Sequence, residues 1–128
     1  MELKISTTAE KQIVDITERV NKLLAGSKVK NGLVSLFVTH TTCALTTADL
    51  DPGTDMDMLD AFDKIIPNLN YRHPHDPEHV GDHIMSSIIG PSLLIPCKNA
   101  NMVLGAWQRV VLVEVSGPRE RRIIVDIL

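Results

Sequence analysis

From Leu93 to the C-terminus the chain is a succession of short segments rich in Val, Ile and Leu, and this feature most constrains the fold. Segments of that composition, separated by turn residues, are typical of β-strands. A hairpin turn is predicted at residues 98–101, and another turn at Gly117-Pro118. The predicted strands are Leu93–Ile95, Met102–Leu104, Val110–Val115 and Arg122–Ile127.

The N-terminal part alternates between strand and helix patterns. Thr17–Ala25 is predicted to be helical because Val20, Leu23 and Leu24 recur at helical spacing, and Gly26 is the expected C-cap. Strands are predicted at Leu3–Thr7, Lys11–Asp15, Gly32–Thr39 and Cys43–Thr47.

Two Asp-Pro pairs, Asp51-Pro52 and Asp76-Pro77, are predicted to begin helices, with Asp as the capping residue and Pro in the first turn. The first helix should end before Pro67 and the second at Gly90-Pro91, with Val80, Ile84 and Ile88 as the second helix's apolar stripe. Strands, one helix, strands, two helices and strands in that order predict an α+β fold, a mainly antiparallel sheet or sandwich forming a single domain over residues 1–128.

Composition narrows the function classes. A net charge of −3 provides no broad basic surface for nucleic acid, and no segment is long and apolar enough for a membrane span. The N-terminus has no apolar signal-peptide region, so we expect a cytoplasmic protein in which Cys43 and Cys97 are buried, reduced thiols. Aromatic residues make up only 3%, so the core must consist of Ile, Leu, Val and Met.

All five histidines lie between positions 40 and 83, and His is the residue that both binds metals and titrates near neutral pH. His83 and Ser87 are one helical turn apart, and His40 ends a strongly apolar strand. His75 and His79 are equally well explained as solvated residues at a helix boundary. We therefore take His40, His73 and His83 as candidate site residues and metal ligands.

Aspartates crowd the first predicted Asp-Pro helix, and most are explained by the helix dipole or by solubility. Asp49 and Asp57 are the candidates for general acid/base work or for orienting a cation. Trp107-Gln108 is accounted for by core packing at the start of a strand. The three arginines after Gly117-Pro118 are typical of a solvated loop, although one of them could hold a phosphate. Phosphate-loop, nucleophile-elbow and His-Glu-x-x-His signatures are absent from the sequence.

The ordered series of motifs over nearly the whole chain resembles the YjbQ family, small proteins often described as secondary thiamine-phosphate synthases. The motifs are Gly32-Leu33 through His40-Thr41-Thr42-Cys43, Asp51-Pro52 with Asp57, Tyr71-Arg72-His73, His83-Ile84 with Ser86-Ser87 and Gly90-Pro91, Leu104-Gly105-Ala106-Trp107-Gln108, Glu114, and Gly117-Pro118-Arg119 with Arg121-Arg122. One departure is Ala48-Asp49, where the family pattern tends to have Asn-Glu.

The resemblance implies an α+β sandwich that forms a homotrimer, with a polar site near the subunit boundaries. It implies that His40, His73 and His83 are the site histidines. Motif positions for catalysis or substrate binding are Asp57, Ser87, Trp107, Gln108, Glu114 and Arg122, and Asp49 keeps a carboxylate where the chain departs from the family pattern.

The reaction implied is the coupling of a pyrophosphorylated pyrimidine to a thiazole phosphate. Either a divalent ion such as Zn or Mg held by His40, His73 and His83, or those imidazoles acting directly, would assist it, and no organic cofactor is expected. The partner would be a small phosphorylated molecule. Two alternatives use the same residues: a non-catalytic trimeric protein that binds a metal or anion, and a metal-assisted phosphohydrolase.

Overall fold

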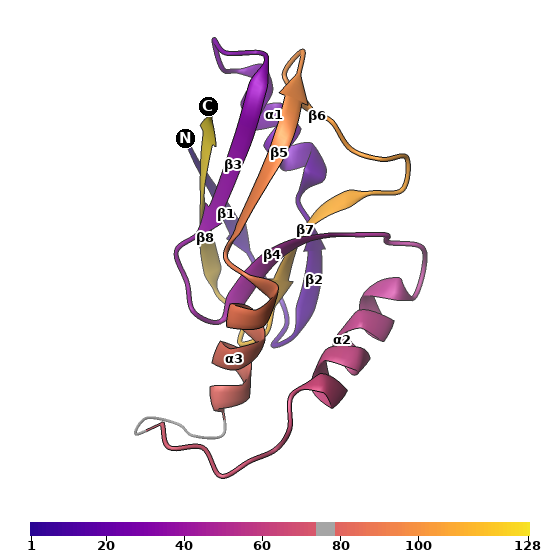
Figure 1. Ribbon diagram of the computed structural model, residues 1–128, viewed down its shortest axis with the longest axis vertical. Coiled ribbons are helices and arrows are strands. Elements are labelled where there is room, and N and C mark those ends of the chain that lie inside the picture. The colour runs from indigo at the N-terminus through magenta and orange to yellow at the C-terminus, as the bar shows by residue number, and fades with distance from the viewer. Residues whose placement is uncertain (74–78) are drawn as a thin grey trace.

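The computed structural model describes residues 1–73 and 79–128 and contains two antiparallel sheets and three helices (Figure 1). One sheet has five strands in the order β1-β8-β3-β5-β6, and the other has three in the order β2-β7-β4. Every pair of neighbouring strands is antiparallel, so the predicted α+β class with antiparallel sheets is confirmed. The elements are β1 (Glu2–Ser6), β2 (Gln12–Asp15), α1 (Thr17–Ala25), β3 (Gly32–Val38), β4 (Cys43–Ala48), α2 (Thr54–Ile65), α3 (Val80–Ile89), β5 (Ser92–Lys98), β6 (Asn101–Met102), β7 (Arg109–Glu114) and β8 (Glu120–Ile127).

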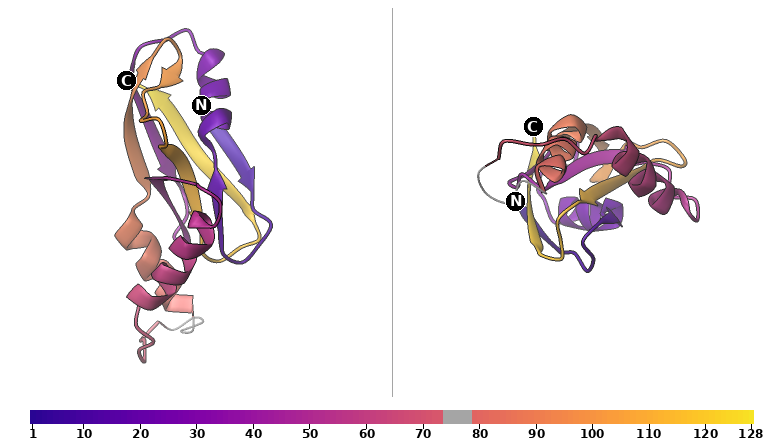
Figure 2. Two further views of the ribbon diagram at one scale, coloured as in Figure 1. Left: turned by 90° about the vertical axis from the view of Figure 1, so that its right-hand side faces the viewer. Right: turned by 90° about the horizontal axis from the view of Figure 1, so that it is seen from below.

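The main core lies between the two sheets and is closed along one side by α1 (Figure 2). Leu36 and Ile123 from the five-stranded sheet pack with Leu112 from the three-stranded sheet, and α1 adds Val20 and Leu24. These side chains are fully buried and aliphatic, as the scarcity of aromatic residues predicts. Burial of apolar surface of this kind is the main contribution to folding stability.

A second core lies on the opposite face of the three-stranded sheet, under α2 and α3. Val111 and Val113 of β7 point to this side, where they meet Met85 of α3 and Phe62 of α2. Strand β7 is therefore covered on both faces, which explains why its residues are apolar without alternation.

Helix α1 has the predicted bounds, and Gly26 is its C-cap as expected. The capping role predicted for Asp51 is wrong: Gly53, with φ of 92°, is the N-cap of α2, and no side chain caps the helix. Asp51 instead contributes its carbonyl, which accepts a hydrogen bond from the Thr54 N–H at 2.9 Å. Because glycine adopts positive φ without strain, the tight turn rather than a carboxylate starts this helix. The second predicted Asp-Pro cap, at 76–77, lies outside the described residues.

The prediction that α3 is buried through its apolar stripe is wrong, because a different face of the helix meets the sheet. Ile88 is 64% exposed, whereas Met85 and Ser86 are the buried residues of the helix. The helix packs on β4 through this narrower face, so Ile84 and Ile88 lie to one side of the contact. Position on a helical wheel gives the relative order of side chains but not which of two apolar edges meets the sheet.

The strands agree with the prediction to within a few residues, and the turn between β5 and β6 is a hairpin in which Asn99 and Ala100 have φ of 52° and 60°. Both cysteines are buried and unpaired, as expected. None of the helices in the described part of the chain is long and apolar enough to cross a membrane.

Candidate functional site

His40 lines a hollow of about 500 Å³ at the end of the five-stranded sheet, two residues beyond β3. The main-chain N–H of Arg122, on the neighbouring strand β8, donates a hydrogen bond to His40 Nε2 at 2.9 Å. Because Nε2 is the acceptor, the proton of the neutral imidazole must be on Nδ1. His40 therefore presents a fixed ring with one N–H donor.

The surroundings of His40 favour the neutral ring. Burial lowers the pKa of His40, and the positive charges of Arg121 and Arg119 lower it further, against an opposing effect of Glu114. The imidazole is thus uncharged near pH 7 and acts as a hydrogen-bond donor rather than as a cation.

Arg121 forms the floor of the same hollow and is held by a buried carboxylate. Its Nε donates to Glu114 Oε2 at 2.7 Å, and its Nη2 donates to Glu114 Oε1, a bidentate pair in which the side chains are 1% and 0% exposed. Nη2 also donates to the Thr42 carbonyl at 3.0 Å and to Thr42 Oγ1 at 2.9 Å. The guanidinium is therefore fixed between β7, β8 and the β3–β4 loop.

Glu114 is fully occupied as an acceptor. Thr7 Oγ1 donates to Glu114 Oε2 at 2.8 Å, and the Ser116 N–H donates to Oε1 at 3.1 Å. Burial alone would raise the pKa of Glu114, but the hydrogen bonds from Arg121, Ser116 and Thr7 outweigh it and hold the pKa below its usual value. The carboxylate stays ionised and serves to position Arg121.

Gly117 allows this network to close. A Cβ at position 117 would lie 2.5 Å from the Ala9 carbonyl oxygen, 2.8 Å from Thr7 Oγ1 and 2.9 Å from Glu114 Cγ. Real Cβ atoms do not approach other atoms so closely, so a side chain here would push Thr7 and Glu114 apart.

The three arginines that follow Gly117-Pro118 have different positions. Arg119 lines the hollow and donates from Nε to the Ser116 carbonyl at 2.9 Å. Arg122, predicted to hold phosphate, has its side chain on the outer surface, where Nε donates to Glu2 Oε2 at 2.6 Å. Arg122 reaches the hollow only through its main-chain N–H.

His73 and His83 lie together, with ring centroids 5.4 Å apart and ring planes inclined by 13°. Ser87 Oγ donates to the His83 carbonyl at 3.0 Å and so stays on the helix surface. The described residues that line the His40 hollow include neither His73 nor His83. Within residues 1–73 and 79–128, no three His, Cys, Asp or Glu side chains are placed to hold a metal ion. A single chain therefore does not supply a three-ligand metal centre from the residues described.

The remaining predicted residues lie outside the hollow. The Asp49 carboxylate accepts a hydrogen bond from the Asp51 N–H at 3.0 Å within a local turn. Asp57 is exposed in the first turn of α2. Trp107 is 73% exposed, which contradicts its placement in the core. Gln108 donates from Nε2 to Thr47 Oγ1 at 3.1 Å and accepts from the Gly105 N–H at 3.1 Å, so it ties its turn to β4. His75 lies outside the described residues.

Two packed antiparallel sheets, three helices and a hollow lined by imidazole, guanidinium and threonine hydroxyl groups define a small α+β protein with a candidate anion site. The chain belongs to the YjbQ family: the sequence profile described as "UPF0047 protein YjbQ-like" matches residues 1–128.

Relatives and solved structures agree with this assignment. A UPF0047 protein from Archaeoglobus fulgidus is 33% identical and covers 100% of both chains, and YjbQ from Salmonella typhimurium is 37% identical over 82% of this chain and 81% of its own. A crystal structure of a YjbQ/UPF0047 protein from Clostridium acetobutylicum superposes with a TM-score of 0.90 at 33% identity, covering 100% of this chain and 99% of that one. A YbjQ-like protein of unknown function from Sulfolobus solfataricus has a TM-score of 0.91 at 30% identity, over 99% of this chain and 94% of its own.

Sequence reasoning missed Arg121 as a site residue and favoured Arg122. The signal that identifies it is strand alternation: Arg121, Ile123 and Val125 are on one face of β8, and the two apolar members of that set are fully buried. An arginine in phase with buried residues must have a buried partner.

Proposed function

We propose that the His40 hollow binds the pyrophosphate of a small phosphorylated substrate, and that the protein is a transferase of the thiamine-phosphate synthase type. The substrates would be a pyrophosphorylated pyrimidine and a thiazole phosphate. The observation that carries the proposal is that His40, Arg119, Arg121 and three threonines surround one hollow, and that none of its described lining residues is Asp or Glu.

The chemistry of this coupling suits a site made only of donors and cations. The lone pair of the thiazole nitrogen attacks the methylene carbon of the pyrimidine, and the bond from that carbon to the pyrophosphate oxygen breaks. Pyrophosphate leaves with the bonding electrons, and negative charge grows on its oxygens. Preorganised N–H and guanidinium groups stabilise that charge in the transition state. The attacking nitrogen carries no proton, so this step needs no general base.

A phosphohydrolase fits the hollow less well. Hydrolysis needs a base to activate water, but the acceptor nitrogen of His40 already receives the Arg122 N–H. Glu114, the nearest carboxylate in this network, is saturated by Arg121, Thr7 and Ser116. A non-catalytic anion-binding protein remains the second candidate, because the same donors would hold a phosphate without turning it over.

We also propose that the protein is a homotrimer and that the His73/His83 pair of one subunit completes the His40 hollow of another. The outer face of β3 and β5 exposes Leu33, Phe37 and Leu94, by 40%, 45% and 60%. Apolar residues gathered on one face of a sheet are typical of a subunit interface. Under this proposal a Zn or Mg ion would be held by His73 and His83 of one subunit and by the pyrophosphate in the hollow of another, because the acceptor nitrogen of His40 receives the Arg122 N–H.

Binding is tested by titrating inorganic pyrophosphate in a calorimeter. We expect Arg119→Gln to weaken binding by about tenfold, because one charge-assisted hydrogen bond is lost. Arg122→Gln is the matched control: it removes the same charge three residues further along the chain, from a side chain that faces Glu2, and we expect no change. Equal losses in the two variants would contradict the hollow as the binding site.

Turnover is tested by assaying thiamine phosphate formation from the two substrates. We expect product with the unaltered protein and none with His40→Ala. Mixed subunits of His40→Ala and His83→Ala should recover part of the activity, since some sites then contain both histidines. Tight pyrophosphate binding without product would favour the binding protein over the enzyme.

Assembly is tested by light scattering. We expect the mass of three chains for the unaltered protein and of one chain for Leu94→Glu, which buries a charge in the interface. Met56→Glu is the control because Met56 is equally exposed, at 59%, but lies on α2. A single-chain mass for the unaltered protein would refute the trimer.

A further inference from the structure

We propose that a cavity between α2 and α3 is a second small-molecule site, which binds a compound with an apolar ring and a protonated amine. Its volume is about 300 Å³, which is within the lower range of ligand sites. None of its described lining residues also lines the His40 hollow. The inference does not depend on the proposed function, which concerns the other site.

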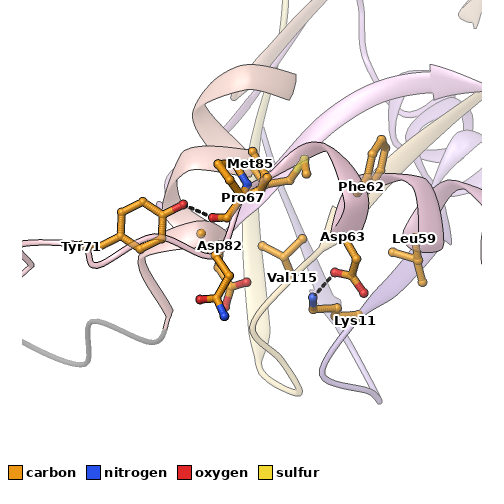
Figure 3. A pocket seen from close by; sticks show the side chains of 12 residues that line it. Lys11, Leu59, Phe62, Asp63, Pro67, Tyr71, Asp82, Met85 and Val115 are labelled. Carbon is orange, nitrogen blue, oxygen red and sulfur yellow. Dashed lines mark hydrogen bonds and ion pairs between the residues drawn. The ribbon is translucent and has the colours of Figure 1, made fainter.

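The wall of the cavity is apolar. Leu59 and Phe62 come from α2, Met85 comes from α3, and Val115 directly follows β7 (Figure 3). Gly81 allows α3 to pass close to α2, since a Cβ there would lie 3.3 Å from Ile66 Cγ2. Position 81 contributes no side chain to the space between the helices. An aromatic ring bound there would bury apolar surface on several sides, away from water.

The polar side of the cavity has an excess of one negative charge. Lys11 Nζ donates to Asp63 Oδ1 at 2.5 Å, so these two groups neutralise each other. Asp82 lies between that pair and Tyr71, and its side chain is only 15% exposed (Figure 3). One oxygen of Asp82 contacts His79 Nδ1 at 3.1 Å, which is an ion pair only when that ring is protonated, and the negative charge of Asp82 also acts on Lys11. Among the described lining residues one lysine therefore faces two carboxylates, which leaves an excess of one negative charge.

This arrangement selects the class of ligand. An anionic ligand would approach two carboxylates, and a neutral one would leave the excess negative charge beside Lys11 uncompensated. An ammonium group beside Asp82 gains a charge-assisted hydrogen bond in a partly buried position, while its apolar body fills the space between Phe62 and Met85.

The test uses the protein labelled with [methyl-13C]methionine and 2-phenylethylamine as the probe. Met85 is the methionine that lines the cavity, and the other four methionines of the chain are internal controls. We expect a saturable shift of the Met85 methyl signal only. We expect 2-phenylethanol and 3-phenylpropanoate to bind about tenfold more weakly, because neither forms the ion pair. No saturable shift at Met85, or equal affinity for the alcohol, would overturn the proposal.

Variants test whether Asp82 is the carboxylate that pairs with the amine. Asp82→Asn should weaken the amine by about tenfold, while Asp60→Asn, which removes an exposed carboxylate of α2 outside the cavity, should leave it unchanged. The double change Asp63→Asn with Asp82→Asn leaves Lys11 as the one charged side chain among the described lining residues, so the preference should reverse towards 3-phenylpropanoate. An unaltered Met102 signal reports that the core between the sheets is intact. Equal weakening by Asp60→Asn, or an unchanged preference in the double variant, would contradict the assignment.

Discussion

Arg121 and Arg122 are neighbours on β8, and each is paired with a glutamate, yet the two pairs lie in opposite environments. Arg121 and Glu114 are 1% and 0% exposed between the sheets, whereas Arg122 and Glu2 are 52% and 34% exposed on the outer surface. Successive side chains of a strand point to opposite faces, so one residue of register separates a buried pair from a solvated one.

The comparison shows why the same chemical pair has two roles. In water a charge that loses its partner is solvated, so the exposed pair contributes little. In the interior the remaining charge has no such replacement, and both partners are needed. The buried pair also fixes a guanidinium beneath the His40 hollow, while the exposed pair keeps Arg122 away from it.

The largest effect should come from breaking the buried pair. We expect Glu114→Gln to lower the free energy of unfolding by about 3–5 kcal/mol, because Arg121 then remains as an uncompensated buried charge. Urea unfolding followed by circular dichroism measures the loss. A change below about 1 kcal/mol would mean that water reaches Arg121 and that the buried pair contributes no more to stability than an exposed one.

Acid should weaken the same pair in the unaltered protein. The pKa of Glu114 is lower in the folded chain than in the unfolded one, so its stabilising contribution is complete above the unfolded value of about 4.3 and is lost as the pH falls through the folded pKa. We expect the urea midpoint to fall more steeply below that pH than in a Glu114→Leu/Arg121→Met variant. Identical slopes would show that Glu114 does not titrate with a depressed pKa.

The Glu114→Leu/Arg121→Met variant also measures the net contribution of the whole ion pair to the free energy of unfolding. Replacing both charges with apolar residues removes the desolvation cost together with the attraction, so we expect less than roughly half the loss of Glu114→Gln. The Thr42 hydroxyl loses the Arg121 donor, and the Thr7 hydroxyl loses Glu114 but keeps the main chain of Arg119, so some destabilisation remains. A loss as large as that of the single variant would indicate that hydrogen bonding to these threonines dominates.

Local pattern was sufficient to predict most elements of the fold. Helix α1 and strands β3, β4 and β7 were located from apolar spacing and β-branched runs, because these signals come from the residues themselves. The contact face of α3 and the start of α2 were not, because the first depends on how the helix meets β4 and the second on the positive φ of Gly53.

The site was less predictable because its residues meet through strand pairing. His40 was selected as a polar residue at the end of an apolar strand, but its partner is the main chain of Arg122, which no side-chain pattern reveals. Arg121 and Glu114 are seven positions apart on adjoining strands of different sheets, and their contact exists only once both sheets pack. Asp49 and Asp57 were predicted as site residues from the composition of the Asp-rich segment alone, and both lie outside the hollow.

The smallest effect should come from the exposed pair. Arg122→Gln removes one ion pair that water and salt already screen, and we expect a loss of at most about 1 kcal/mol, decreasing further as salt is added. The same urea experiment at low and high ionic strength measures it, with Glu2→Gln as the reciprocal change. Because the Arg122 N–H to His40 belongs to the main chain, neither variant should release the imidazole. A loss comparable to that of Glu114→Gln would mean that the outer face of β8 is buried in the assembled protein, so that the subunit contact proposed for β3 and β5 extends across β8.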